Sequence, residues 1–360
     1  MKKKTFAFLI ALLTFIVGVA LARISLTKET PPPAPAPAIK EFQGSSYRLS
    51  GPYQHENLTV FLIHAPDQPG SRVFLPLQEA MERKLVIVHE TQEVNELAIE
   101  NVSKSEEVFV QAGDIVKGGQ QDRVLAVDLI VPANSGEIPI SAFCVEHGRW
   151  SQRGAEPAAM FSRSEQMSAT KELKIAIKKD ASQAKVWSEV NVAQEKLSSG
   201  VAGFTGVPNE DVRSVASRSS LQLTLENDKV QALTAEYIDK LSSIVGAHSD
   251  VIGFVFAIND KLNSADVYAS NAMFKRFWPR LLKTAAIEAV AERPLREKSE
   301  PVTISAAAEF LAASEQGKEA IDEVTTRTHI LRREGGNNLF FETRDMAHDG
   351  RWVHRNYLTK

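Results

Sequence analysis

The sequence predicts an α+β fold, with a β-rich N-terminal half followed by a half of mixed helices and strands. Short apolar runs with strand character fill the chain up to Trp150. Beyond Trp150, apolar residues recur at helical spacing and alternate with further strand-like runs. The alternation is not the regular one of a doubly wound parallel sheet, so α+β is the better class. We expect an antiparallel, sandwich-like part at 45–150 and an α+β part at 151–360, packed together as one domain.

In the first half, residues 132–137 (PANSGE) carry turn chemistry and join the two clearest predicted strands. The helical spacing at 75–84 predicts the one helix of this half. Apolar runs predict strands at 58–64, 85–88, 96–102, 108–111, 124–131 and 138–146.

In the second half, Asn271 is the predicted N-cap of a helix over 272–291, which Pro279 should kink. A turn at 334–337 predicts a hairpin, and 351–358 is expected to close the sheet as an edge strand. Helices are further predicted at 182–198, 223–245 and 302–314, and strands at 251–258, 325–333 and 339–344.

The N-terminus predicts export. Three lysines precede an uncharged, almost wholly apolar run from Thr5 to Ala22, which ends in the small-x-small pattern of a signal-peptidase site. The segment 1–22 is therefore read as a signal peptide, with an uncleaved membrane anchor as the alternative. Residues 23–44 form a proline-rich linker, extended by its TPPPAPAPA run. Either reading places the rest of the chain in the periplasm or outside the cell.

The composition excludes some function classes. The chain has 360 residues, 43% of them apolar and 24% charged, which suits a packed globular core. Its net charge of −3 becomes −6 without Lys2–Lys4, and no dense basic run follows, which argues against nucleic-acid binding. Cys144 is the single cysteine, so no internal disulfide forms, and a buried apolar role suits it better than a reactive thiol.

No local motif predicts a cofactor or a metal. The eight histidines form no His-x-His or His-Glu-x-x-His pair, so only a metal site assembled from distant residues stays open. The hydrolase motif Gly-x-Ser-x-Gly is absent. The glycine-rich stretch 113–119 opens a strand rather than a helix, so it does not predict a phosphate-binding loop.

The segment from Gly113 to Trp150 carries the candidate site. If residue 131 pairs with 138 in an antiparallel hairpin, Arg123 lies opposite Glu146 at the end of an apolar face. In one reading these two form a structural cross-strand ion pair. In the other, the arginine fork and a partner carboxylate line a pocket for an anionic ligand. The residues predicted to bind the ligand are Lys117, Gln120, Gln121, Arg123, Glu146, Arg149 and Trp150.

The same residues resemble a known family. The pieces that match are 113–114, 117–123, 131–132, 138–140, 144–150, 183, 186–190, 251–258, 264–268 and 274–282. In these the sequence is similar to the ARG and rhodanese-phosphatase-superfamily-associated protein domain, although Asp122 stands where the family pattern has Asn. The resemblance implies an α+β domain linked to NAD or ADP-ribose metabolism, and it assigns no reaction or catalytic residue. Export to the cell envelope disfavours NAD chemistry.

Three function classes follow. The first is a binding or accessory module whose polar Arg/Glu/Gln pocket takes an anionic small ligand. The second is a hydrolase of a phosphorylated or ADP-ribose-like substrate, with Glu146 or Asp114 as the general base. The third is a structural domain of the cell envelope. No cofactor is predicted, and membrane contact is expected only through an uncleaved N-terminal segment.

Overall fold

Strand β13 (Val251–Ile258) lies near the middle of the largest sheet in a computed structural model of the protein. All eight of its residues are buried, because both faces of the sheet are covered there, which explains why the run carries no charge. The structure describes residues 39–41, 46–91, 93–154, 156, 159–293 and 300–360. The predicted signal segment 1–22, and the linker apart from residues 39–41, lie outside this part. Residues 37–360 form one compact unit.

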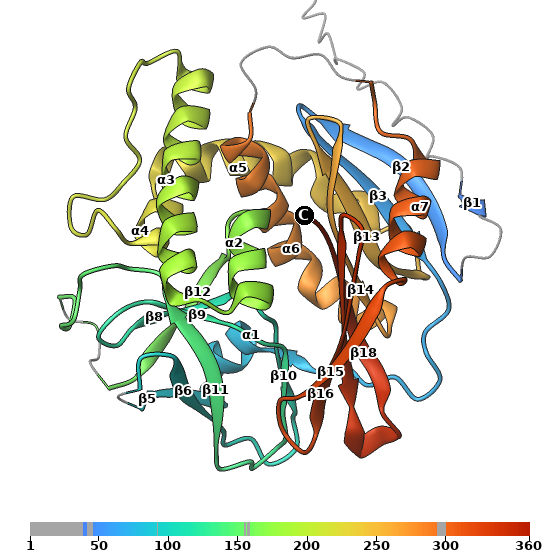
Figure 1. Ribbon diagram of the computed structural model, residues 1–360, viewed down its shortest axis with the longest axis horizontal. Coiled ribbons are helices and arrows are strands. Elements are labelled where there is room, and N and C mark those ends of the chain that lie inside the picture. The colour runs from blue at the N-terminus through green and yellow to red at the C-terminus, as the bar shows by residue number, and fades with distance from the viewer. Residues whose placement is uncertain (1–38, 42–45, 92, 155, 157–158, 294–299) are drawn as a thin grey trace, which may run out of the picture. The chain divides into compact units, whose positions relative to one another are not determined.

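The largest sheet has nine strands in the order β1-β2-β3-β13-β14-β18-β17-β16-β15, and all neighbours are antiparallel (Figure 1). Strands from the N-terminal half pair directly with strands from the C-terminal half, since β3 pairs with β13. Its strands are β1 (Lys40–Glu41), β2 (Arg48–His55), β3 (Leu58–His64), β13, β14 (Lys261–Tyr268), β15 (Lys318–Glu323), β16 (Thr328–Gly335), β17 (Asn338–Asp345) and β18 (Arg351–Thr359).

Two smaller sheets are built from the remaining strands. The six-stranded sheet has the order β12-β8-β9-β11-β6-β5, and the three-stranded sheet the order β10-β7-β4. Their strands are β4 (Leu75–Pro76), β5 (Val86–Glu90), β6 (Glu96–Asn101), β7 (Val108–Val110), β8 (Asp114–Gly118), β9 (Arg123–Leu125), β10 (Leu129–Val131), β11 (Glu137–Cys144) and β12 (Phe161–Met167). Apart from the parallel pair β4–β7, neighbouring strands are antiparallel, and this mixture of antiparallel sheets and helices confirms the predicted α+β class.

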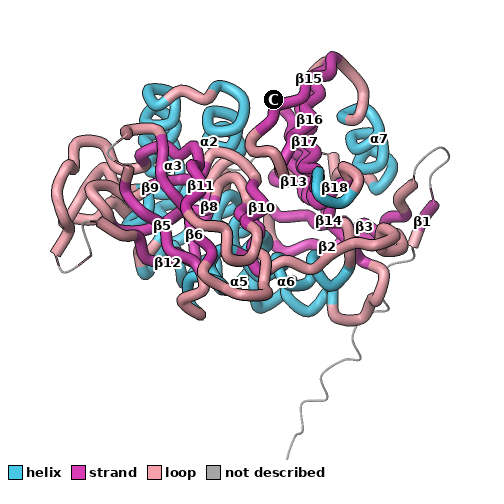
Figure 2. The backbone as a smooth tube through the Cα atoms, turned by 90° about the horizontal axis from the view of Figure 1, so that it is seen from below, coloured by secondary structure: helices cyan, strands magenta, loops and turns pink. Residues whose placement is uncertain are grey.

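Helices cover both faces of the nine-stranded sheet. Alternate residues of β3 divide between two cores: Leu62 packs with α6, whereas Phe61 packs with α7 on the opposite face. Figures 1 and 2 show α7 apart from the other long helices. The helices are α1 (Leu77–Glu82), α2 (Lys171–Ile175), the π-helix η1 (Ala176–Asp180), α3 (Gln183–Thr205), α4 (Leu221–Leu225), α5 (Asp228–Leu241), the 3-10 helix η2 (Ser242–Val245), α6 (Asn271–Ala291), α7 (Ile304–Ser314) and the 3-10 helix η3 (Met346–His348).

In the C-terminal half, three predicted elements differ from the structure in their cap, their continuity or their place in the sheet. Ser270, not Asn271, caps α6, because its hydroxyl accepts the N–H of Met273 while the Asn271 amide donates to the Val251 carbonyl. The helix predicted over 223–245 is broken, because Asn227 caps a new helix at that point. The strand predicted to close the sheet is not at its edge, since β18 pairs with β14 and β17. No helix in the described ranges has the length and hydropathy to cross a bilayer.

Candidate functional site

The predicted hairpin is wrong in its pairing. Residues 124–131 form two strands in different sheets: β9 pairs with β11, whereas β10 pairs with β7. Arg123 consequently lies opposite Cys144, which precedes the predicted partner, Glu146, by two residues. The physical reason is the buried carboxylate of Asp128, which accepts the Ala112 N–H at 2.8 Å and anchors the chain between the two strands. A period-two pattern does not reveal such a change of sheet.

The buried Arg123 guanidinium is bound by a different acid. It pairs with Glu90 at 3.0 Å and donates to the Val94 carbonyl at 2.7 Å. The sulfur of Cys144 lies against the same guanidinium, and burial raises the pKa of that thiol to about 11. Arg123 therefore belongs to a buried ion pair within the six-stranded sheet. A structural ion pair was one of the two predicted interpretations, but the predicted partner was Glu146, not Glu90.

Glu146 lies in a second buried ion-pair group with Asp122. Both carboxylates are fully buried, and Arg153 pairs with Asp122 at 2.8 Å. The Arg149 Nε donates to Glu146 at 2.6 Å, and its guanidinium also reaches the Gly119 carbonyl at 3.2 Å. Two arginines thus neutralise two acids. A buried group balanced in this way has no surplus positive charge for an anion.

The other predicted residues are dispersed around this group. Lys117 pairs with Glu226 at 2.9 Å, and Trp150 is exposed. Gln120 is half-buried. Gln121 is fully buried, and its amide has no hydrogen-bond partner among the described residues.

Asp114 lies apart, on β8, where it pairs with Arg280 of α6 at 2.7 Å. Burial raises the pKa of Asp114, although the guanidinium acts in the opposite direction. The structure thus brings Glu146 and Arg149 together but separates Asp114 and Arg123 from them.

A second charged network was missed by the sequence analysis, and it lies where the three sheets meet. His354 of β18 bridges two buried carboxylates: its Nδ1 lies 2.7 Å from Asp128 and its Nε2 lies 3.0 Å from Asp266 of β14. Burial alone would lower the pKa of His354, but the two carboxylates raise it above the ordinary value. Burial would likewise raise the pKa of Asp128, yet His354 first, with Lys178 and Thr343, brings it below its usual range.

Lys178 extends this network to two cavities. It lies on η1, and π-helical turns are frequent at functional sites because they place one side chain out of the regular ladder. Its ammonium donates to Asn356 at 2.8 Å and lies 4.3 Å from the centre of the Phe341 ring. Burial lowers the pKa of Lys178, and the nearby Asp128 and Asp266 only partly restore it. Within the described residues, the ammonium has this one hydrogen bond although it carries three protons.

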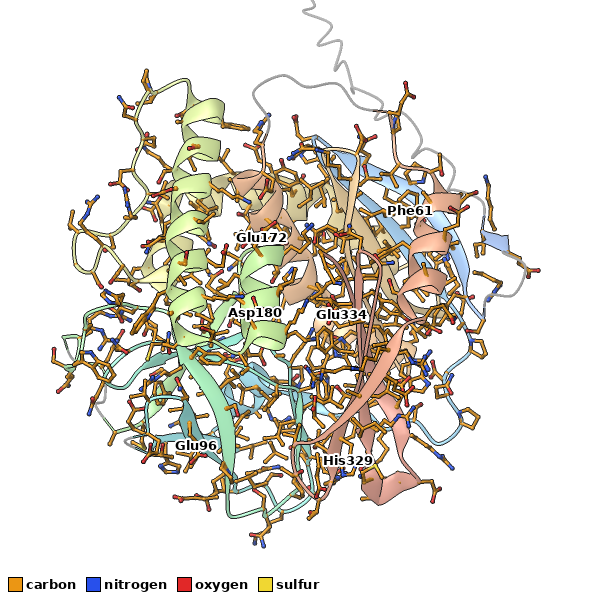
Figure 3. The ribbon with its side chains drawn as sticks, viewed as in Figure 1. Phe61, Glu96, Glu172, Asp180, His329 and Glu334 are labelled. Atoms are coloured by element: carbon orange, nitrogen blue, oxygen red, sulfur yellow. The ribbon has the colours of Figure 1, made fainter. Side chains whose placement is uncertain are left out.

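Lys178 lines both cavities. One cavity, of about 30 Å³, contains Asp266, and another, of about 60 Å³, contains Asp128. The second adjoins a wider cavity of about 220 Å³ between η1 and strands β15–β17, because both are lined by Arg332 and Phe341. Figure 3 labels Glu334 of β16, which lines the wider cavity and pairs with Lys179 of η1, and Asp180, the last residue of η1. We call the two adjoining cavities the basic cleft.

The basic cleft has more cations than acids. Its charged lining residues are Lys178, Lys179, Lys318, Arg332 and Arg333 against Asp128, Asp322 and Glu334. Arg332 is held by Asp322 at 2.5 Å and Lys179 by Glu334 at 2.7 Å. Lys318 makes no hydrogen bond or ion pair with any residue in the described ranges. Among the described residues, Lys178 and Lys318 are therefore the cations of the cleft that form no ion pair with a carboxylate.

Fold and site together define an α+β domain with a buried Asp-His-Asp network beneath a basic cleft. Within this class, the chain belongs to the ARG and Rhodanese-Phosphatase-superfamily-associated Protein domain family, which it matches over residues 46–358. The match confirms the resemblance seen in the sequence, and it contains every residue of the network and of the cleft. No curated protein and no solved structure matches the chain.

Proposed function

We propose that this protein is an exported binding module that holds a small anionic ligand in the basic cleft, with Lys178 as the anchor. One observation carries the proposal. The half-buried Lys178 ammonium lies beside a cavity and makes one hydrogen bond among the described residues, so most of its hydrogen-bonding capacity is left for an anion in the cavity. The proposal keeps the ligand class predicted from the sequence but moves its site from Arg123 to the basic cleft around Lys178.

The size of the cleft supports a compact ligand. Pockets for drug-sized molecules measure about 300–1,000 Å³. The wider cavity, at about 220 Å³, lies below this range. A phosphate, a carboxylate or a sugar phosphate matches it better than a dinucleotide or intact ADP-ribose. The Phe341 ring and Leu339 supply an apolar wall for the uncharged part of such a ligand.

Export belongs to the same proposal and rests on the N-terminal sequence alone. The basic start, the apolar run and the Ala-Leu-Ala end at 20–22 support a signal peptide, and the proline-rich stretch supports a spacer. The ligand would then be met in the periplasm or outside the cell. N-terminal sequencing of the protein recovered from its native cells tests this: a start at Arg23 supports cleavage, and an intact Met1 supports an anchor.

A hydrolase is the second candidate, and the position of Asp128 in the cleft wall favours it. The same carboxylate contacts His354, the residue type most used in general acid–base catalysis. Both ring nitrogens of His354 already contact carboxylates, however, and the side chain is buried. Glu146 and Asp114 are equally held by arginines. Binding is therefore the function that the geometry supports better, and turnover of phosphate or ADP-ribose esters would reverse this order.

A thermal-shift screen of the full chain tests the proposal, with phosphate, sugar phosphates, small carboxylates and ADP-ribose as probes. A ligand at one hundred times its Kd should raise the Tm of a unit of this size by roughly 4 °C. Lys178→Met should abolish the shift. Lys185→Met is the matched control, because Lys185 lies nearby on α3 but is exposed and paired with Asp180.

Two results would overturn the proposal. One is a flat screen, which would favour the structural-domain reading, and the other is a shift that Lys178→Met retains. Lys318→Glu keeps the test decisive if Lys178→Met does not fold. Lys318 is exposed at the rim of the cleft, so its substitution spares the core and should still weaken binding by about tenfold. Binding should also weaken as the pH rises, because Lys178 loses its charge. This weakening should begin at a lower pH than for an ordinary lysine, because burial lowers the pKa of Lys178.

A further inference from the structure

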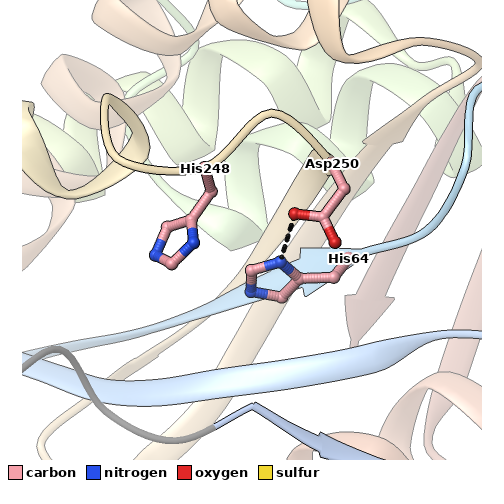
Figure 4. A group of neighbouring side chains, drawn as sticks. All are labelled: His64, His248 and Asp250. Carbon is pink, nitrogen blue, oxygen red and sulfur yellow. Dashed lines mark hydrogen bonds and ion pairs between the residues drawn. The ribbon is translucent and has the colours of Figure 1, made fainter.

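We propose that His64, His248 and Asp250 form a site for a divalent transition-metal ion of the zinc type. One nitrogen from each histidine and one carboxylate oxygen all lie within 4.8 Å of one another. Figure 4 shows the three side chains side by side. This group lies apart from the basic cleft and shares no residue with it. The histidines are far apart in the sequence, which explains why no local spacing predicted the site.

Two paired strands and the connection that precedes one of them hold the group in place. His64 is the last residue of β3, and Asp250 directly precedes β13, which pairs with β3. The Ala65 N–H donates to the Asp250 carbonyl at 3.0 Å and fixes the backbone at this point. His248 lies in the short connection between η2 and β13, with its ring perpendicular to that of His64 at 5.0 Å. Ligands on strand ends are held more rigidly than ligands on long loops.

The distance between His64 and Asp250 suits two ligands of one ion. The Nδ1 of His64 lies 3.0 Å from the Asp250 Oδ1. With bonds of about 2.1 Å, ligand atoms at a right angle lie about 3.0 Å apart, and ligand atoms at the tetrahedral angle about 3.4 Å apart. An ion can thus take the place of the shared proton with little movement of either side chain. A ring nitrogen of His248 lies within 4.8 Å of both atoms, so rotation of this half-buried side chain toward the ion would complete the set.

A second hydrogen bond prepares His64 for this role. Its Nε2 lies 2.8 Å from the buried Ser50 hydroxyl. Without metal, the Nδ1–H donates to Asp250, and Nε2 accepts from the hydroxyl. With metal on Nδ1, the proton lies on Nε2 and donates to the same hydroxyl, because a serine can donate or accept. A partner of this kind on the second nitrogen accompanies almost every metal-binding histidine.

The ligand set selects the class of metal. Two imidazoles and one carboxylate suit Zn²⁺, Co²⁺, Ni²⁺ or Fe²⁺, whereas Mg²⁺ and Ca²⁺ prefer oxygen alone. Three protein ligands leave at least one position for water or another molecule. Arg48 pairs with the other oxygen of Asp250 at 2.7 Å and leaves Oδ1 for the ion. That arginine is partly exposed, so its charge is screened by solvent.

Titration of the full chain, carrying no polyhistidine tag, tests the proposal. Zn²⁺ binding by calorimetry and the visible absorption of Co²⁺ should both show one site per chain, with a Kd of about 10 µM or lower. Mg²⁺ should not compete. His248→Ala should weaken Zn²⁺ binding by at least about 30-fold, and Ser50→Ala by about tenfold through the orientation of His64.

His348→Ala is the matched control. His348 also pairs with an aspartate, Asp345, at 2.9 Å, but among the residues that the structure describes no second histidine joins them in such a group. Its substitution should leave Zn²⁺ binding unchanged. His248 is only half-buried, so its alanine variant should keep the ligand-free Tm of the wild type. The proposal is refuted if the wild type shows no saturable site, or if His248→Ala binds Zn²⁺ as tightly as His348→Ala.

Discussion

Removal of the His354 side chain should destabilise the protein strongly. The imidazole is 1% exposed and lies between Asp128 and Asp266, at 2.7 and 3.0 Å. His354→Ala leaves two buried carboxylates without this cation. Each keeps other donors: Asp128 keeps the Ala112 N–H and the Thr343 hydroxyl, and Asp266 keeps the amides of Gln111 and Asn356.

The hydrogen bonds that the two carboxylates keep determine how much stability His354→Ala loses. Breaking a buried ion pair by removing one partner costs about 3–5 kcal/mol. Because both carboxylates stay partly solvated by protein donors, we expect the lower end, about 3 kcal/mol, in urea unfolding at pH 6.5. That value is a large share of the usual 5–15 kcal/mol of a domain. His348→Ala is the control: its histidine makes a half-exposed ion pair, worth about 0–1 kcal/mol.

The pH dependence gives a second, independent test. The pKa of His354 in the folded state is raised, so the stabilisation by its charged form is complete below the unfolded pKa of about 6.5. It is lost as the pH rises through the folded pKa. The difference in unfolding free energy between wild type and His354→Ala should therefore shrink from pH 6.5 toward alkaline pH. A loss below about 1 kcal/mol at pH 6.5, or a difference that grows with pH, would refute the reasoning.

Three further predictions concern other buried contacts. Cys144 should resist alkylation at pH 8 in the native protein and react after unfolding in urea, because burial raises its pKa to about 11; fast native labelling would contradict this. Gly200→Ala should lower the free energy of unfolding in urea by about 1–3 kcal/mol, because a Cβ at Gly200 of α3 would lie 1.9 Å from the Val290 carbonyl of α6. The neighbouring control Ser199→Ala should change it by close to zero. Arg123→Ala should lower the Tm, because it leaves its partner Glu90 buried and unpaired. The folded protein should still bind the ligand of the basic cleft. An unchanged Tm together with lost ligand binding would instead identify Arg123 as the anchor of the ligand.

The sequence predicted those helices and strands whose residues are buried throughout or at regular intervals along the chain. β13 has the predicted bounds, because an uncharged run of eight residues has few alternatives to a strand covered on both faces. α6 differs from its prediction by one residue at the start, since two adjacent residues, Ser270 and Asn271, both suit an N-cap. Local chemistry therefore sufficed where an element is decided by its own residues.

Pairing between strands was not predictable in the same way. The alternation over 124–131 is real, but it does not say that the chain changes sheets at Asp128. β18 was predicted as an edge strand, but it pairs with a strand on each side. In the structure, its polar His354 is buried by pairing with a carboxylate from each of two other segments. A buried charge whose partners lie 88 and 226 residues away has no local signature.

The position of β18 links the completion of the fold to the formation of the candidate site. This last strand pairs on both sides, and it carries His354 to the point between Asp128 and Asp266. Asn356 of the same strand holds the Lys178 ammonium beside the cavity. Without β18, β14 and β17 would each present an unpaired edge, and the two carboxylates would lack their shared cation. If Lys178 binds an anion as proposed, it can do so only after the C-terminal strand has entered the sheet. Ligand binding should then report on folding of the whole 37–360 unit.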